Sequence, residues 1–123
     1  MDWKLELVAV PVSDVDRAKA FYAGQVGFNV DFDQTVSDAL RFVQLTPPGS
    51  ACSIAIGKGI TSATPGSVQG LLMVVPDIHA AHAELTERHV PVTDVETLDW
   101  GSFVYFRDPD GNAWSVQQLP ARP

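Results

Sequence analysis

The chain has a single cysteine, Cys52, so it cannot form an internal disulfide. That excludes a small secreted domain held together by disulfides and agrees with a reducing compartment. The longest apolar run, Leu71 to Val75, is far shorter than the ~20 residues that a membrane-spanning helix needs. The first residues, Met1 to Lys4, do not form a signal peptide. The sequence therefore predicts a soluble, cytoplasmic protein.

Positive charge is also scarce. Eight lysines and arginines stand against fifteen aspartates and glutamates, which gives a formal net charge of −7. Phosphate binding needs a basic face, so this balance argues against a nucleic-acid partner. The acidity would suit a cationic ligand but does not require one, because acidic surfaces often serve solubility alone. With 123 residues and 46% hydrophobic content, the chain can form one domain with a packed core.

Two motifs occur twice along the chain at nearly one spacing. Residues 7–14 (LVAVPVSD) resemble residues 70–77 (GLLMVVPD), and Asp77 lies 63 positions after Asp14. Residues 46–53 (TPPGSACS) resemble 108–115 (DPDGNAWS), and Ser115 lies 62 positions after Ser53. Chance similarity would not keep this register, so the sequence indicates a duplicated module.

We expect one domain, 1–123, made of two modules. The first spans 1–57 and the second 68–123, and residues 58–67, rich in Gly, Ser, Thr and Pro, form the linker.

Each module is expected to run strand, helix and three strands. A helix over 15–23 follows the start signal Ser13-Asp14 and stops before Gly27. A second begins after Asp77 and ends near His89, where a residue with positive φ is expected. The predicted strands are 4–10, 28–32, 40–45, 51–56, 71–75, 92–95, 102–106 and 113–118.

Several short motifs resemble those of one known family. They are Val10-Pro11-Val12-Ser13-Asp14, Arg17-Ala18, Phe21-Tyr22, Gly27-Phe28 and Asp108-Pro109-Asp110-Gly111-Asn112. Together with the half-length repeat they resemble the vicinal oxygen chelate superfamily, which includes glyoxalase I, extradiol dioxygenases and bleomycin-resistance proteins. The resemblance covers essentially the whole chain. It implies an α+β fold in which two βαβββ modules form an incomplete eight-stranded barrel around a cavity, often in a homodimer.

Metal-using members of that superfamily place ligands at four sites. The motifs match these sites to Leu7, Ser53, Gly70 and Ser115. A divalent metal requires imidazole, carboxylate or thiolate ligands, and leucine and glycine supply none of these. Neutral serine hydroxyls cannot hold a metal without charged partners. We therefore expect a cavity with no metal and no cofactor.

The remaining candidates for metal binding or nucleophilic chemistry are three histidines and the cysteine. His79 and His82 are spaced for one helix face, which is typical of a solvated outer surface, and no third ligand is placed near them. His89 lies beyond them, at the helix end. Cys52 has no identifiable base beside it and is expected to be a buried structural thiol. Whether any of the four has a further role is left open by the sequence.

Strand alternation, counted from the four sites, predicts which side chains line the cavity. Tyr105 is placed inward by its resemblance to a tyrosine of fosfomycin-resistance members. Phe103 follows by parity, and Arg41 follows because the repeat pairs it with Phe103. The predicted ligand-binding set is Leu7, Arg41, Ser53, Gly70, Leu72, Trp100, Phe103, Tyr105, Ser115 and Gln117. Such a cavity is largely apolar, as expected for an organic ligand.

Each assignment has an alternative that the sequence leaves open. Phe103 and Tyr105 fit core packing as well as ligand contact. Arg41, if it faces inward, must meet an acid or an anionic ligand, and otherwise it is a surface charge. Trp100 either caps the cavity or lies at a dimer interface. The two serines either hydrogen-bond a ligand or only relieve crowding.

Three functions are consistent with these residues. The first is a metal-free protein that binds a small organic molecule between modules or subunits, as in drug sequestration. The alternative is a metal-independent isomerase, lyase or cyclase, with Tyr105 and Arg41 as candidate catalytic residues, although no matched acid and base are seen. The third is a structural or regulatory dimer with a vestigial cavity. The identity of the ligand is not encoded in any motif.

Overall fold

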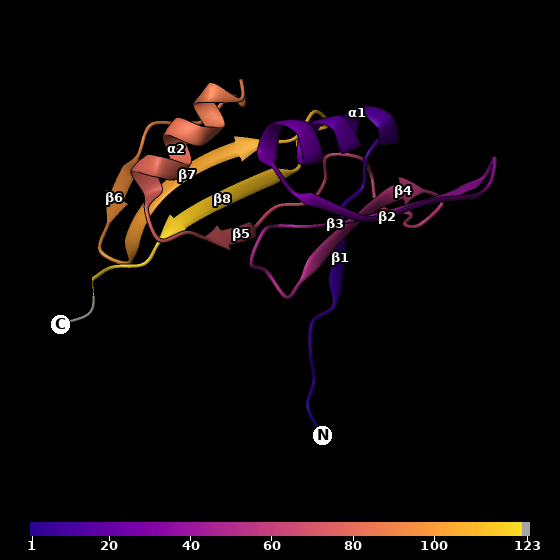
Figure 1. Cartoon of the computed structure of the whole chain (residues 1–123), viewed down its shortest axis with the longest axis horizontal. Coiled ribbons are helices and arrows are strands. Elements are labelled where there is room, and N and C mark those ends of the chain that lie inside the picture. The colour runs from indigo at the N-terminus through magenta and orange to yellow at the C-terminus, as the bar shows by residue number, and fades with distance from the viewer. Residues whose placement is uncertain (122–123) are drawn as a thin grey trace.

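The computed structural model describes residues 1–121, which form two modules lying side by side (Figure 1). Positions 122 and 123, assigned above to the second module, lie outside the described residues. The first module contains β1 (Leu7–Ala9), α1 (Val15–Lys19), the π-helix η1 (Ala20–Val26), β2 (Asn29–Ser37), β3 (Leu40–Thr46) and β4 (Ser53–Lys58). The second contains β5 (Leu71–Val74), α2 (Ile78–Glu87), β6 (Glu96–Leu98), β7 (Gly101–Arg107) and β8 (Ala113–Gln118). No helix among residues 1–121 is both long and apolar enough to cross a membrane.

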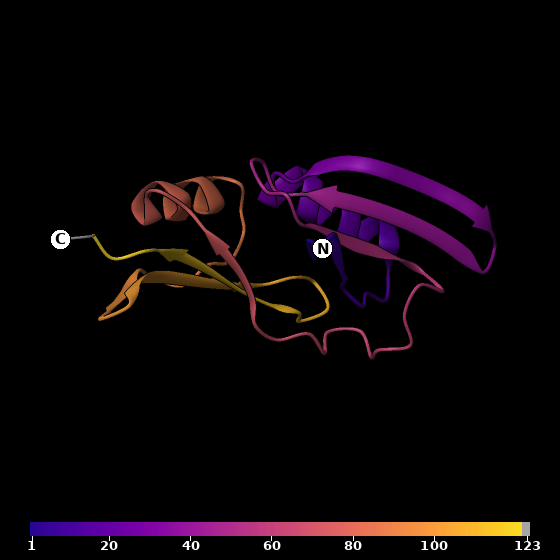
Figure 2. The same cartoon turned by 90° about the horizontal axis from the view of Figure 1, so that it is seen from below.

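Each module has one four-stranded sheet of the same topology. The strand orders are β1-β4-β3-β2 and β5-β8-β7-β6, and the first pair of each sheet is parallel while the others are antiparallel. This confirms the predicted α+β fold of two βαβββ modules. The two sheets remain separate and lie side by side (Figure 2), so within the described chain they do not close into one barrel.

The first helix begins where the sequence predicts. The Asp14 side chain accepts a hydrogen bond from the Arg17 backbone N–H at 3.0 Å, which satisfies one of the free donors at the helix start. The helix runs past the predicted end at Ala23, because after Lys19 it widens into η1. It stops at Gly27, whose φ of 95° is a conformation that glycine adopts without steric cost.

The second helix is capped by Asp77 and followed by His89, whose φ of 63° confirms the expected left-handed residue. The strand predicted over 92–95 is wrong. Only one bridge, Val92 to Phe106, forms there, and β6 begins later, at Glu96. The Thr93 hydroxyl accepts from the Tyr105 N–H at 2.9 Å, in place of the backbone carbonyl that a strand ladder would use.

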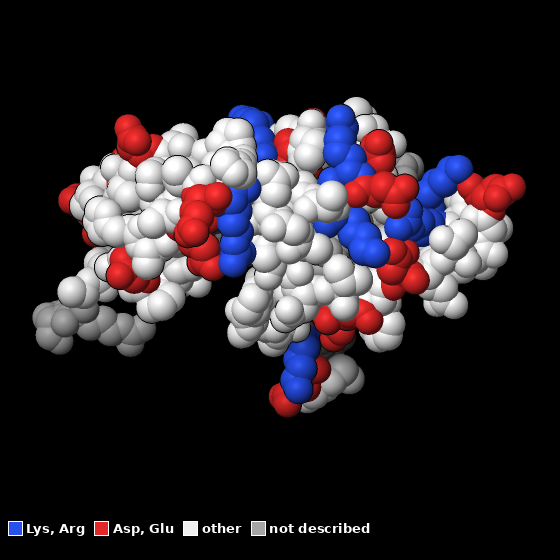
Figure 3. Space-filling model, turned by 45° about the horizontal axis from the view of Figure 1, so that its top comes forward, with Lys and Arg blue, Asp and Glu red and all other residues white. Residues whose placement is uncertain are grey.

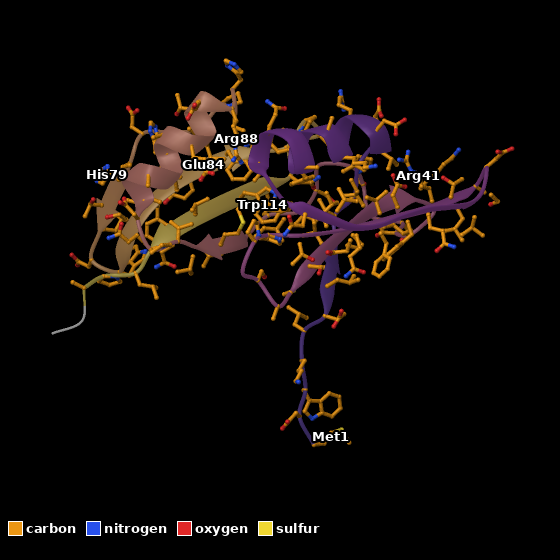
Figure 4. The ribbon with its side chains drawn as sticks, in the orientation of Figure 1. Met1, Arg41, His79, Glu84, Arg88 and Trp114 are labelled. Carbon is orange, nitrogen blue, oxygen red and sulfur yellow. The ribbon has the colours of Figure 1, made fainter. Side chains whose placement is uncertain are left out.

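A buried aromatic junction joins the two modules. The Tyr22 hydroxyl donates to Asp108 Oδ2 at 2.7 Å and accepts from Trp114 Nε1 at 2.9 Å. Burial, with the Asp108 charge as a second cause, raises the pKa of Tyr22 far above its ordinary value. Phe28 packs edge-on to Trp114, which lies between the two modules in Figure 4. One hydrophobic core therefore continues from the first module into the second.

Asn112 completes this junction and explains the Asp-Pro-Asp-Gly-Asn motif. Its Nδ2 donates to the Pro11 carbonyl and to Asp108 Oδ2, both at 2.8 Å, and its Oδ1 accepts from the Val68 N–H at 3.0 Å. Asn112 is fully buried. The motif therefore forms a turn and also provides buried hydrogen bonds that connect the second module to the first.

Candidate functional site

Each sheet has one face packed against helices and one face that no described helix covers. Val43, Leu45, Ile54 and Ile56 of the first sheet belong to the core cluster, so their neighbours in sequence point the other way. We call the uncovered sides the first open face (Leu7, Asp31, Gln44, Thr46 and Ser53) and the second open face (Leu72, Phe103, Tyr105, Ser115 and Gln117).

Large apolar side chains are exposed on and beside these faces. Leu72 and Val74 on β5 are 52% and 56% exposed, and Leu5, just before β1, is 71% exposed. Alternate residues on the same strands, such as Met73, pack against the core instead. Contiguous exposed apolar groups on a folded protein mark an interaction surface.

Two stacked aromatic rings dominate the second open face. The Phe103 and Tyr105 rings are parallel within 2°, with centroids 6.0 Å apart. Burial raises the pKa of the Tyr105 phenol, and the Glu96 charge adds to this. A groove of about 710 Å³ opens beside Tyr105, with Thr93 and Ser115 in its lining. The surface offers flat apolar contact to a ring-shaped ligand.

Of the other predicted residues of this module, Ser115 and Gln117 lie on the inner strand β8 and Trp100 lies in the turn between β6 and β7. Gln117 is nearly buried, and its Nε2 donates to the Trp100 carbonyl at 2.8 Å, which holds the turn between β6 and β7 in place. The Trp100 side chain itself is 62% exposed. Ser115 lies opposite Tyr105 in the β7–β8 ladder.

Ser53, a predicted ligand-binding residue, lies on the first open face with three polar side chains that the sequence did not predict there. Gln44 Nε2 donates to Ser53 Oγ at 3.2 Å, Ser53 Oγ lies 2.6 Å from Thr46 Oγ1, and the Thr46 hydroxyl donates to Asp31 Oδ2. We call these four residues the polar row. A β-bulge brings Asp31 to this face, since the ladder passes from Val30 directly to Phe32 and leaves Asp31 unpaired.

The prediction that Arg41 faces the cavity is wrong. Arg41 lies on the helix-covered side, where its guanidinium bonds Asp33 at 3.0 and 2.9 Å and Asp16 of α1 at 2.7 Å. The cause is the register of the repeat. Gln117 lies 62 positions after Ala55, but their ladder partners Phe103 and Gln44 are only 59 apart. These two offsets differ by three. Because side chains alternate between the two faces of a strand, an odd difference moves a residue predicted to face inward to the opposite face.

The position equivalent to Leu7 also differs from the prediction. Leu7 lies opposite Ser53, whereas the residue opposite Ser115 is Leu72 rather than Gly70. The second module is two residues shorter between its first strand and its helix cap, so counting back from Asp77 overshoots by two. A shift of two residues keeps the same face of the strand, and Leu72 was already predicted to line the cavity.

The residues at the four equivalent positions do not fit a metal. They are Leu7, Ser53, Leu72 and Ser115, which offer two alkyl groups and two neutral hydroxyls where a divalent ion needs imidazole, carboxylate or thiolate. Among residues 1–121, no group of three His, Cys, Asp or Glu side chains is placed to hold an ion. His79 and His89 are exposed and His82 is half-buried, and Cys52 is half-buried beside β4.

Five salt bridges pair charged side chains of the described residues, and two of them engage Arg41 with Asp16 and Asp33. On the side drawn in Figure 3, basic and acidic side chains lie interspersed rather than in a broad basic area. Hydrogen bonds from Arg41 and then Lys19 hold the pKa of Asp33 well below its usual range. The ion pairs of Arg41 thus account for its position without any ligand.

We expect Arg41→Ala to leave ligand binding within about twofold of the parent and to lower stability by about 1 kcal/mol at pH 7. Because the Asp33 pKa is lower in the folded chain, the Arg41–Asp33 pair stabilises the folded state at pH values above the ordinary aspartate pKa of about 4. The stabilisation is lost as the pH falls through and below that value. Urea unfolding of both proteins between pH 3 and 7 should show their stabilities converging at acid pH, and a constant difference would contradict the account.

The comparisons with known proteins agree with this geometry. Residues 4–116 match the family model of the Glyoxalase/Bleomycin resistance protein/Dioxygenase superfamily. TnmS3, an antibiotic binding protein from Streptomyces sp. CB03234, is 36% identical, with a TM-score of 0.87 over 97% of this chain and 98% of that one.

Two further relatives extend the likeness. A superfamily member from Sphaerobacter thermophilus DSM 20745 is 31% identical, with a TM-score of 0.83 over 95% of this chain and 98% of that one. The uncharacterized protein YetH of Bacillus subtilis (strain 168) is 25% identical over 113 residues, covering 90% of this chain and 94% of YetH. The chain belongs to the Glyoxalase/Bleomycin resistance protein/Dioxygenase superfamily.

Proposed function

We propose that the protein binds a small organic molecule, without a metal, in a cavity that two copies of the chain form together. The observation that carries this is the Phe103–Tyr105 stack, in which Phe103 is buried and Tyr105 half-buried, with Ser115 beside it and exposed Leu72 on the same sheet. Flat apolar surface with a few polar groups suits an aromatic compound. The antibiotic-binding relative supports drug sequestration as the biological role.

A second copy is needed because one chain leaves both open faces uncovered. A two-fold dimer that sets the first open face of one copy against the second open face of its partner forms two equal cavities. It also removes the exposed side chains of Leu5, Leu72 and Val74 from water. The proposal is therefore a homodimer with two shared sites.

Thermal unfolding with a panel of aromatic antibiotics tests this function, together with metal analysis of the purified protein. A true ligand at 100-fold above its dissociation constant should add about 2.7 kcal/mol to the free energy of unfolding. No stoichiometric metal should be found. A bound divalent ion at one per site, or a panel that never changes the midpoint, would contradict the proposal.

The same samples separate binding from catalysis. Tyr105 is the one predicted catalytic candidate that lies on an open face, whereas the Arg41 side chain is engaged by Asp33 and Asp16. A binding protein should return each ligand unchanged after incubation. A product whose formation stops in Tyr105→Phe would instead favour the metal-independent enzyme.

A further inference from the structure

The polar row on the first open face has one fixed hydrogen-bond direction. Asp31, as a carboxylate, only accepts, so the single Thr46 hydroxyl proton points to it. Thr46 Oγ1 then accepts the proton of Ser53, and the Ser53 oxygen accepts from the Gln44 amide. Every donor in the row thus points toward Asp31.

This direction decides what the row can offer a ligand. The Gln44 amide must turn its nitrogen to Ser53, which leaves its carbonyl oxygen free. The second Asp31 oxygen, Oδ1, receives no hydrogen bond within residues 1–121, and neither does Gln44 Oε1. Both ends of the row therefore present acceptors, which match a ligand group that donates.

The charge of Asp31 strengthens this requirement. Asp33, two residues on but on the other side of the strand, is paired with Arg41 and Lys19. Asp31 has no ion-pair partner among residues 1–121. When a partner subunit covers this face, an unpaired carboxylate becomes costly unless a positive group meets it.

Resting on the proposed function, we propose that the polar row is the subsite for a protonated amine carried by an aromatic ligand. The ring lies against the Phe103–Tyr105 stack of one copy, and an N–H group of its cationic nitrogen system donates to Asp31 of the other. Gln44 Oε1, at the other end of the row, is an acceptor for a further donor of the ligand. The ligand class is therefore an aromatic amine that is cationic at neutral pH.

Two probes with one ring system test this. 9-Aminoacridine is protonated at neutral pH and acridine is neutral there, and both report binding through their fluorescence. The parent protein should bind 9-aminoacridine about tenfold more tightly than acridine. Asp31→Asn should reduce the preference to about twofold or less and leave acridine binding unchanged. Thr46→Val, which breaks the row next to Asp31, should weaken the preference in part.

Asp33→Asn is the matched control, because it removes the same charge from the same strand on the other side. It should keep the tenfold preference. Equal binding of the two probes by the parent, or equal loss of preference in both aspartate variants, would overturn the assignment while leaving the binding function intact. If neither probe binds, the proposed function fails and the assignment fails with it.

Discussion

Asn112→Ala is expected to lower the free energy of unfolding by about 3 kcal/mol or more. The substitution removes three hydrogen bonds at once and leaves the Val68 N–H without its partner at the joint between modules, while the Pro11 carbonyl keeps only the bond from the Gly66 N–H. Leaving a buried backbone group unsatisfied costs about 1–3 kcal/mol. For a domain of this size the loss corresponds to a fall of roughly 10 °C in the midpoint.

Thermal and urea unfolding followed by circular dichroism measure this effect. Asn29→Ala is the control, because Asn29 is an exposed asparagine at the start of β2 and should change stability by less than about 0.5 kcal/mol. An Asn112→Ala protein as stable as the control would mean that the turn only reverses the chain and does not lock the modules.

Phe103→Ala is expected to weaken binding of 9-aminoacridine by about 50-fold or more. The residue forms half of the ring stack on the second open face, and aromatic side chains that anchor an interface carry about 2 kcal/mol or more. Fluorescence titration gives the dissociation constant for the parent and the variant.

Phe103 is 7% exposed, so its truncation also threatens the fold. Phe103→Leu supplies the check, because it keeps apolar volume in the sheet but offers no ring for stacking. A well-folded Phe103→Leu protein should still bind at least tenfold more weakly than the parent. If this variant bound with the affinity of the parent, the ring stack would not be part of the binding site.

Much of the fold could be predicted because its signals are local. Asp14 and Asp77 are followed by helices, and His89 has the positive φ expected after a helix. Ser53 and Ser115 lie on the open faces, as the repeat indicated, because each follows a turn of recognisable composition. Whether they contact a ligand stays a prediction.

The errors concern residues whose face on a strand depends on the length of a connection or on a bulge elsewhere in the sheet. Arg41 was misplaced because the connection before β8 is longer than the one before β4 by an odd number of residues. Asp31 was missed because a bulge changes the face without any distinctive residue type. Gly70, rather than Leu72, was matched to the position of Leu7 because the second module has two fewer residues between its first strand and its helix cap. Hydrophobic alternation within one strand carries no information on these lengths.

The most direct test of a site shared by two copies is subunit complementation. One chain carries Phe103→Leu on the second open face, and the other carries Gln44→Trp, which fills the first open face with an indole. Neither homodimer should bind 9-aminoacridine tightly. Co-expression with two different tags allows the mixed dimer to be purified.

In a shared arrangement the mixed dimer has one site with both defects and one with none. It should therefore bind about half as much 9-aminoacridine as the parent dimer, with parental affinity. If each site belonged to a single chain, every site would carry one defect. A mixed dimer that binds as weakly as the two variants, or two tagged chains that never associate, would contradict the account.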